Sequence, residues 1–191
     1  MDTPARCSWP LKPLDVSYHD EEWGVPVHDD RTLFEFITLE GAQAGLSWST
    51  VLAKRPHYRA AFRQWDVEAI ADFPDGQVDL LMQNAGLVRH RQKLVSTVGN
   101  ARAFLAIQKS FGSFNAYLWR FVNGTPIDNR RAEPHQVPTH TTVSDALSTD
   151  LKARGFRFVG TTICYAYLQA VGLVNDHLVS CYRHDQVATY R

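Results

Sequence analysis

The spacing of apolar residues is the feature that most limits the folds open to this chain. Apolar side chains recur three and four residues apart along most of the sequence, whereas the alternating β-branched runs of half-buried strands are almost absent. In residues 31–40, RTLFEFITLE, this spacing places Leu33, Phe34 and Ile37 on one stripe of a helix. The chain has 191 residues, 45% of them hydrophobic, which is enough for an ordinary core. We therefore predict an all-α protein with a single domain, residues 1–191.

Glycines and capping residues divide the middle of the chain into further helices. Residues 77–86 predict a helix that ends at Gly86, and a long helix follows that includes Leu94 and Leu105. Ser113 is expected to cap the next helix, which buries Phe114. Residues 123–141 contain three prolines and no periodicity, so they predict the longest loop of the chain.

A short turn bounded by glycines joins the next two predicted helices. Thr142 or Ser144 is expected to cap the first, which ends at Gly155, and the second follows Gly160 and ends at Gly172. One interpretation is an ordinary pair of antiparallel helices. The other is a phosphate-binding turn, because backbone amides at a turn and at a helix N-terminus bind an anion without a basic side chain.

The charges of the chain cancel in total but are unevenly distributed. A net charge of zero argues mildly against a protein that holds nucleic acid by bulk electrostatics. Residues 51–160 nevertheless carry fifteen Lys and Arg against nine Asp and Glu, while residues 1–50 carry three against nine. A basic surface could form on one side, although such runs are more often solvated helix faces. No apolar run approaches the roughly 18 residues that span a bilayer, and no secretion signal is evident, so we expect a cytoplasmic protein.

Two pairs of soft metal ligands lie near opposite ends of the sequence. His177 and Cys181 are four residues apart and share one helical face, although such a pair alone is more often structural. Cys7 and His19 complete a possible Cys2His2 set for tetrahedral zinc. Four protein ligands leave no open position, so such a zinc would be structural and would join the two ends of the chain. Other histidines leave the choice of ligands open, namely His28, His57, His90 and His184.

Glu40 is an acid in an apolar stripe. A helix through Leu33, Ile37 and Ala44 places the Glu40 carboxylate in the middle of that stripe. A buried carboxylate is costly unless it is paired. Glu40 is therefore either a local cap ahead of Gly41 or a functional acid.

Aromatic residues near Glu40 favour a functional role. Trp48 follows it closely, and Trp9, Tyr18 and Trp23 lie in the segment that the proposed zinc would hold nearby. An acid among aromatic rings suits a flat heterocycle, which such a site binds by stacking and hydrogen bonding. The alternative is a cluster of aromatic side chains in the core.

Several longer stretches together closely resemble bacterial 3-methyladenine DNA glycosylase I, in the right order and over nearly the whole chain. These stretches are YHDEEWGVP (18–26), LEGAQAGLSW (39–48), AGLVRHRQK (85–93), NARAF (100–104), SDAL (144–147) and RGFRFVGTTICYAYLQAVGLVNDH (154–177). The resemblance implies the all-α fold of the helix-hairpin-helix DNA glycosylase superfamily, with its helix-hairpin-helix at about residues 144–172. It also implies double-stranded DNA containing alkylated bases as the partner, and no membrane or protein partner.

The resemblance further implies roles for individual residues. The ligands of a structural zinc would be Cys7, His19, His177 and Cys181, which join residues 7–19 to residues 177–181. The extruded base would be bound by Glu40, which is also the catalytic residue, together with Tyr18, Trp48 and the neighbouring Trp9. The hairpin at 155–160 would hold DNA phosphate, with Gly155, Phe158, Gly160 and Thr161 as the DNA-binding residues. Two features depart from the family pattern: Asp15 stands where a tyrosine is expected, and the spacing from Cys7 to His19 is one residue shorter.

The implied reaction is hydrolysis of the N-glycosidic bond of 3-methyladenine in DNA, the first step of base-excision repair. Methylation at N3 makes the base a cation that departs as a neutral molecule, so little acid catalysis is needed. Related enzymes that also cut the strand carry a Schiff-base lysine just after the hairpin, where this chain has Thr161, Thr162 and Ile163. We therefore expect an abasic product and no lyase activity. Many members of the superfamily use an aspartate after the second helix to stabilise the sugar cation or to activate water, and Asp176 lies near that place. Because its neighbour His177 is the expected zinc ligand, a supporting or capping role is the alternative for Asp176.

Two other classes of function are compatible with parts of the pattern. A non-catalytic, zinc-stabilised DNA-binding protein would keep the hairpin and the zinc without excision, and Asp15 leaves this possibility open. A zinc hydrolase unrelated to DNA would need an open metal position. A monomer is the expected oligomeric state in each case.

Overall fold

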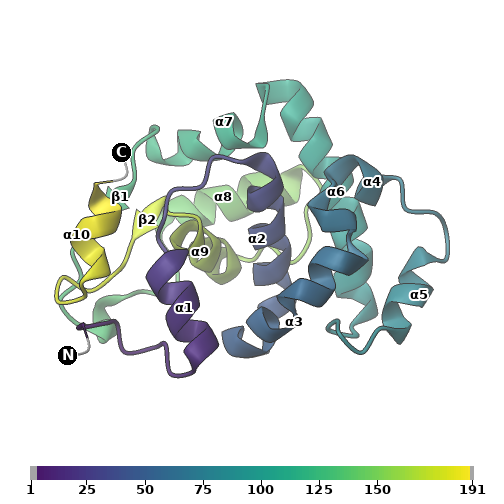
Figure 1. The fold of residues 1–191 in the computed structure, drawn as a ribbon. Coiled ribbons are helices and arrows are strands. Elements are labelled where there is room, and N and C mark those ends of the chain that lie inside the picture. The colour runs from purple at the N-terminus through teal and green to yellow at the C-terminus, as the bar shows by residue number, and fades with distance from the viewer. Residues whose placement is uncertain (1–3, 190–191) are drawn as a thin grey trace.

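The structure is a computed structural model that describes residues 4–189 (Figure 1). Within this range the α-helices are α1 Pro13–Glu21, α2 Asp30–Gln43, α3 Trp48–Ala61, α4 Val67–Ala71, α5 Gln77–Gln83, α6 Arg91–Phe111, α7 Phe114–Trp119, α8 Thr142–Ala153, α9 Thr161–Ala170 and α10 Arg183–Ala188. The 3-10 helices are η1 Arg63–Trp65, η2 Arg120–Val122 and η3 Pro134–Gln136, and the strands are β1 Ile127–Asp128 and β2 Val174–Asn175. No helix among the described residues is both long and apolar enough to cross a lipid bilayer.

The two short strands correct the expectation of a purely helical chain. β1 pairs with β2 in parallel, with Ile127 opposite Val174 and Asp128 opposite Asn175. Residues 123–141 are therefore not a structureless loop, since they contain β1 and η3. Two-residue strands carry no readable periodicity, and their pairing depends on a segment more than forty residues later. This pairing ties the 123–141 segment to the approach to His177.

The helix boundaries follow the capping residues, with one shift at α8. Ser113 caps α7 as predicted and accepts a hydrogen bond from the amide of Ala116 at 2.9 Å. The cap of α8 is Thr141, not Thr142 or Ser144: its hydroxyl accepts from the Ser144 amide at 3.3 Å, and the Ser144 hydroxyl accepts from the Thr141 amide at 2.8 Å. This reciprocal arrangement satisfies two amides that a later start would leave unpaired.

Gly86 does not cap α5. The helix ends at Gln83, and Gly86 lies in the following loop, where its amide donates to the side chain of Asn84 at 2.8 Å. A Cβ at Gly86 would stand 2.5 Å from the ring of His57. The glycine is thus required by close packing against α3, which the sequence pattern does not reveal.

One continuous cluster of buried side chains extends through the helical body, and α2 lies inside it. The helix contacts α3, α6, α7 and α9, and ten of its residues are buried, from Leu33 to Ala42. Fully burying a large apolar side chain contributes roughly 1.5–3 kcal/mol, so α2 is firmly held. A second, smaller cluster forms around Cys7, Leu178 and Cys181, where the two ends of the chain meet.

Candidate functional site

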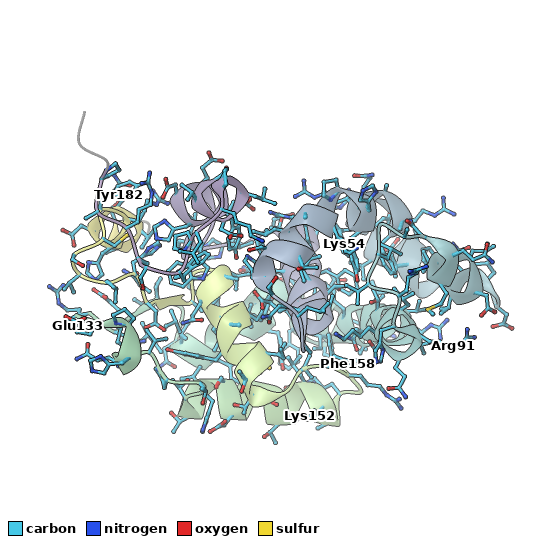
Figure 2. The ribbon with its side chains drawn as sticks, turned by 90° about the horizontal axis from the view of Figure 1, so that it is seen from below. Lys54, Arg91, Glu133, Lys152, Phe158 and Tyr182 are labelled. Atoms are coloured by element: carbon cyan, nitrogen blue, oxygen red, sulfur yellow. The ribbon has the colours of Figure 1, made fainter. Side chains whose placement is uncertain are left out.

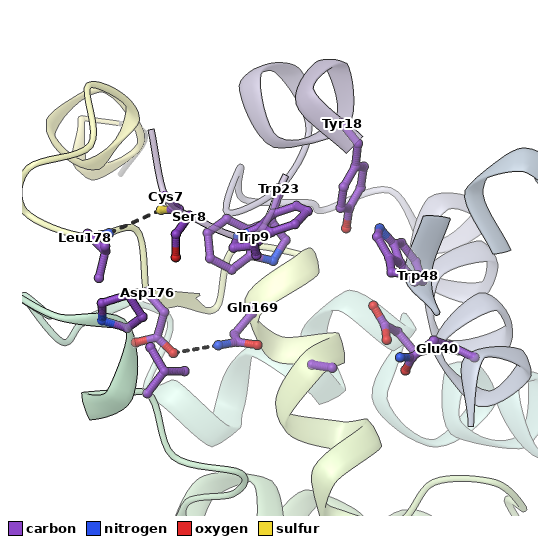
Figure 3. A pocket seen from close by; sticks show the side chains of 14 residues that line it. Cys7, Ser8, Trp9, Tyr18, Trp23, Glu40, Trp48, Gln169, Asp176 and Leu178 are labelled. Atoms are coloured by element: carbon purple, nitrogen blue, oxygen red, sulfur yellow. Dashed lines mark hydrogen bonds between the residues drawn. The ribbon is translucent and has the colours of Figure 1, made fainter. Parts of the chain in front are cut away.

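A cavity of about 340 Å³ opens between α1, α2, the start of α3 and α9. Tyr18 comes from α1, Glu40 from α2, Trp48 from the first position of α3, and Asp176 from the segment after β2 (Figure 3). Glu40 and Trp48 lie on one side of the cavity and Asp176 on the other, with Trp9 between them. The further lining residues are Cys7, Ser8, Trp23, Gln43, Pro134, Val137, Ala166, Gln169 and Leu178.

Glu40 is a buried acid without a partner. Its exposed fraction is 4%, and within residues 4–189 its carboxyl group forms no hydrogen bond or ion pair. Because α2 continues through Gly41 to Gln43, the alternative of a local cap is wrong. Burial raises the pKa of Glu40 to about 8. The group is therefore mainly protonated at neutral pH and can donate or accept a hydrogen bond.

The aromatic side chains line the cavity, and they also border the core: Tyr18 belongs to the main buried cluster, and Trp23 and Trp48 pack against it. The ring centroids of Tyr18 and Trp48 are 5.3 Å apart with planes inclined by 51°, and those of Trp9 and Trp23 are 5.3 Å apart. The Tyr18 hydroxyl and the Trp48 indole N–H are buried and lack a hydrogen-bond partner within the described chain. An unpaired buried polar group costs about 1–3 kcal/mol, so a ligand with polar edges would relieve that cost.

Asp176 lies across the cavity from Glu40, and both of its carboxylate oxygens accept hydrogen bonds. Its Oδ1 accepts from Asn129 at 2.8 Å and from Arg131 at 3.4 Å, and its Oδ2 accepts from Tyr165 and, at 2.8 Å, from Gln169. Four donors occupy the lone pairs that would take a proton from water. Asp176 therefore ties the 129–131 segment to α9.

The four cysteine and histidine side chains from the two ends of the chain form one cluster. The donor atoms of Cys7, His19, His177 and Cys181 all lie within 4.8 Å of one another, and all four side chains are buried. The Cys7 sulfur is 3.7 Å from Nδ1 of His177, and the Cys181 sulfur is 3.6 Å from both Nδ1 of His177 and Nε2 of His19. Tetrahedral zinc, with bonds of about 2.3 Å to sulfur and about 2.0 Å to nitrogen, places these atoms about 3.6 Å apart. The geometry thus fits a metal held by protein groups in all four positions.

Neighbouring groups orient both imidazoles of this Cys/His cluster. The second ring nitrogen of His19 lies 2.8 Å from Oδ1 of Asp20, and that of His177 lies 2.9 Å from the carbonyl oxygen of Trp23. Such contacts set the tautomer and the ring angle of a metal-binding histidine. The alternative histidines His28, His57, His90 and His184 lie outside the cluster.

The turn between α8 and α9 contains two residues with positive φ and, within residues 4–189, presents backbone amides without partners at the start of α9. Phe158 has φ of +57° and Gly155 has φ of +94°. Gly160 is the residue before α9, and within the described chain the amides of Val159, Gly160 and Thr161 donate no hydrogen bond. Free amides at a helix N-terminus carry partial positive charge.

Not every predicted hairpin residue offers a free donor. The Gly155 amide donates to the carbonyl of Lys152 at 3.0 Å, so this glycine shapes the turn. The Thr161 hydroxyl donates to Asp145, which leaves only its amide available. Phe158 lies in the same part of the molecule as Lys152 and Arg91 (Figure 2).

Asp15 lies behind the cavity rather than in it. The residue is buried, and its Oδ2 accepts from the Ser49 hydroxyl at 2.7 Å, which joins α1 to the first turn of α3. Tyr18 and Trp48 stand on these same two helices. The aspartate that departs from the family pattern thus braces two of the aromatic walls and is absent from the cavity lining.

Leu46 was not singled out by its sequence pattern. It lies on the turn between α2 and α3, after Gly45 with φ of +81°, and keeps 39% of its surface exposed beside the cavity residues Gln43 and Trp48. A large exposed apolar side chain at the rim of a site is a candidate for contact with a ligand. The sequence signal that could have identified Leu46 is its position as an apolar residue between Gly45 and Ser47, in a turn where polar residues are usual.

Comparison with known proteins gives one consistent result. The family model for methyladenine glycosylase matches residues 8–184. DNA-3-methyladenine glycosylase 1 of Escherichia coli (strain K12) is 51% identical over 177 residues, which is 92% of this chain and 95% of that protein.

Solved structures agree with the sequence comparison. A crystal structure of 3-methyladenine DNA glycosylase I superposes with a TM-score of 0.92 at 52% identity and covers 94% of this chain and 100% of the other. A tyrosine-to-phenylalanine variant of 3-methyladenine DNA glycosylase I in complex with 3-methyladenine gives a TM-score of 0.89 at 36% identity, over 91% and 93% of the two chains. Because the family model matches almost the entire described chain and both solved structures share its fold, this protein belongs to the methyladenine glycosylase family.

Proposed function

We propose that this protein hydrolyses the N-glycosidic bond of 3-methyladenine in alkylated DNA and leaves an abasic site. The observation that carries the proposal is the unpaired, buried carboxyl group of Glu40, which faces a cavity walled by Tyr18 and Trp48. A cavity of about 340 Å³ is at the small end of ligand pockets, which suits one heterocycle. Relatives that are about half identical over the same length carry the matching name.

Base capture follows from the groups that face the cavity. Extruding a nucleotide costs a few kcal/mol of stacking and pairing, and the cost is lower for a damaged base. Tyr18 and Trp48 offset part of that cost by packing against the ring, while Glu40 hydrogen-bonds its polar edge. A cationic base also favours the ionised form of Glu40, so capture lowers the raised pKa of this group and releases a proton near neutral pH.

Cleavage of the N-glycosidic bond needs no general acid from the protein in this proposal. The methylated adenine carries a positive charge, so the electrons of the breaking C–N bond neutralise it and no proton has to be supplied. Among residues 4–189 no lysine lines the cavity, and Thr161 and Thr162 begin α9, so no lysine of the described chain is placed to form a Schiff base with the sugar. The proposed product is therefore an intact strand with an abasic site.

DNA is held by the hairpin in this proposal. The amides of Val159, Gly160 and Thr161 receive a phosphate at the N-terminus of α9, which accounts for DNA binding by a chain with no net charge. Leu46, exposed at the rim, is placed to fill the gap that the extruded nucleotide leaves in the duplex.

The Cys/His cluster holds a structural zinc in this proposal. When bound, zinc would cross-link the two ends of the chain. Cys7 and His19 belong to the start of the fold, and His177 and Cys181 belong to its end. Trp9 and Trp23 flank His19 in sequence and line the cavity, so the cross-link also holds the aromatic wall. A cytoplasmic location and a monomeric state remain predictions.

The decisive experiment measures free bases released from methylated DNA, resolved by chromatography. Wild-type protein should release 3-methyladenine, and Glu40→Gln should release it at least tenfold more slowly, because one charged hydrogen bond contributes about 1.5–3 kcal/mol. Glu35→Gln is the matched control: Glu35 is equally buried on α2, but its oxygens accept from Arg55 and Arg59 and do not line the cavity. Folded, zinc-loaded wild-type protein that binds DNA and releases no base would support the DNA-binding alternative instead.

A further inference from the structure

Lys93 is a buried cation without a carboxylate partner. Its exposed fraction is 8%, and within residues 4–189 it forms no salt bridge. Its ammonium group instead donates to the carbonyl oxygens of Ala42 at 2.9 Å and Ala44 at 2.6 Å. A buried ammonium is costly unless its donors are satisfied, so this placement on two main-chain oxygens needs an explanation.

The two carbonyls belong to the end of α2. The helix ends at Gln43, and its C-cap residue Ala44 turns away with φ of −48° and ψ of +113° instead of adopting the left-handed conformation of a glycine cap. The last carbonyls of a helix carry partial negative charge. The ammonium group of Lys93 therefore replaces the missing cap.

This helix end carries the proposed base-binding residues. Glu40 lies in the last turn of α2, and Trp48 follows after a four-residue connection, Ala44 to Ser47. Lys93 thus holds the main chain between the acid and the aromatic ring that the base would contact. Within residues 4–189 the ammonium group of Lys93 donates to main-chain oxygens and forms no hydrogen bond with Glu40 or Trp48, so its influence on them passes through the backbone.

The same helix also holds the hairpin. Asn100 is two turns after Lys93 on α6, and its side-chain amide accepts from the Arg157 amide at 2.8 Å and donates to the Arg157 carbonyl at 3.0 Å. The backbone of Phe158 packs closely on Gly41, where a Cβ would lie 3.3 Å from the Phe158 carbonyl oxygen. One face of α6 therefore fixes both the end of α2 and the turn that faces phosphate.

We propose that Lys93 is a positioning residue for base excision, which sets Glu40 and Trp48 relative to the DNA-binding hairpin by capping α2. The inference rests on the proposed glycosylase function. Without the ammonium group the end of α2 loosens, and the pocket loses its alignment with the phosphate site. Misplacement of a catalytic group by about 1 Å costs up to roughly a hundredfold in rate.

The test compares Lys93→Met with Arg102→Met. Arg102 is on the same helix, and its Nε donates to the carbonyl of Ala71 at 2.9 Å, so it caps α4 in the same manner but far from the pocket. We expect Lys93→Met to lower the single-turnover excision rate about tenfold to a hundredfold, while its Kd for an undamaged duplex stays within about twofold of wild type. Arg102→Met should excise at the wild-type rate, and Lys93→Arg, which keeps the cation, should recover most of the loss.

A second readout does not depend on activity. Backbone hydrogen exchange at residues 42–48 should be faster in Lys93→Met than in wild type and unchanged in Arg102→Met. The proposal is overturned if Lys93→Met excises at the wild-type rate, or if Arg102→Met loses as much activity. An inactive wild-type protein would instead reject the proposed function, and the exchange data would still report on the cap.

Discussion

The sulfur of Cys7 lies 3.7 Å from Nδ1 of His177, 170 residues later in the chain. This contact brings together the two ends of the described chain, the part of a fold that usually frays most easily. It also places Trp9, two residues after Cys7, against the cavity that Glu40 faces. The integrity of the Cys/His cluster and the shape of the pocket are therefore linked.

The main effect of zinc removal should be a loss of thermal stability, because all four proposed ligands are protein groups and none of them is proposed to act on the substrate. We expect about one zinc ion per chain, since the four buried ligands complete a tetrahedron. Chelation or Cys181→Ser should lower the melting temperature by about 10 °C or more, because binding of a structural zinc contributes directly to folding. Atomic absorption and thermal unfolding measure the two effects.

Cys164 provides the control for that prediction. It is equally buried, but it lies on α9 with its sulfur 3.5 Å from the Val159 carbonyl oxygen, outside the Cys/His cluster. Cys164→Ala should keep the full zinc content. Loss of zinc from this variant, or a metal-free wild type with unchanged melting, would contradict a structural zinc at Cys7, His19, His177 and Cys181.

The stability of the free protein should depend on pH through Glu40. Burial raises the pKa of this carboxyl group from 4.5 to about 8, so the folded protein binds the proton more tightly than the unfolded chain. The contribution to the free energy of unfolding is complete below pH 4.5, declines as pH rises between the two values, and is lost above about 8. Glu40→Gln, which cannot ionise, should lack this decline.

Thermal unfolding of both proteins between about pH 5 and pH 9 tests this effect. The melting temperature of the wild type minus that of Glu40→Gln should fall with rising pH and level off near the folded pKa. Parallel curves across this range would show that Glu40 titrates normally. Such a result would remove the main electrostatic feature of the pocket.

Asp15 should act on stability more than on base recognition. Its hydrogen bond from Ser49 joins α1 to α3 behind the cavity wall. Asp15→Ala and Ser49→Ala should each lower the free energy of unfolding by about 1–2 kcal/mol, and the double variant should lose less than the sum. Excision by Asp15→Ala should stay within about fivefold of wild type; a loss as large as that of Glu40→Gln would place Asp15 in direct contact with the base.

Leu46 should matter only when the base is inside a duplex. We expect Leu46→Ala to slow excision about tenfold, because extrusion costs a few kcal/mol and the leucine helps to offset it. Quenching of tryptophan fluorescence by free 3-methyladenine should be unchanged. Leu80→Ala is the control, since Leu80 is an exposed leucine on α5, away from the turn between α2 and α3 that carries Leu46. Equal losses in the two variants would argue against a role in the duplex.

Much of the local structure was readable from the sequence. The stripe through Leu33 and Ile37 became α2, the spacing through Leu94 became α6, and Ser113 caps α7. The same periodicity placed Glu40 in the apolar stripe, where the structure buries it. These features depend on residues within one or two helical turns of each other, so a local pattern is enough to predict them.

The tertiary structure alone decided the features that depend on distant residues. Nothing local pairs β1 with β2, places Gly86 against His57, or brings four donors to Asp176. By residue type alone the Cys2His2 set was not a unique choice, because other histidines were present; the fold brings the side chains of Cys7, His19, His177 and Cys181 together.

Lys93 illustrates the same division. In the sequence it is one charge in a basic run, and such runs usually lie on solvated faces. In the folded protein its ammonium group donates hydrogen bonds to carbonyl oxygens at the end of α2, about fifty residues earlier, because α6 crosses α2 at that point. The sequence by itself thus determined the helices and the chemical groups available to them. Only their packing decided which of those groups met, because cavities, metal sites and helix caps form from contacts that chain periodicity does not encode.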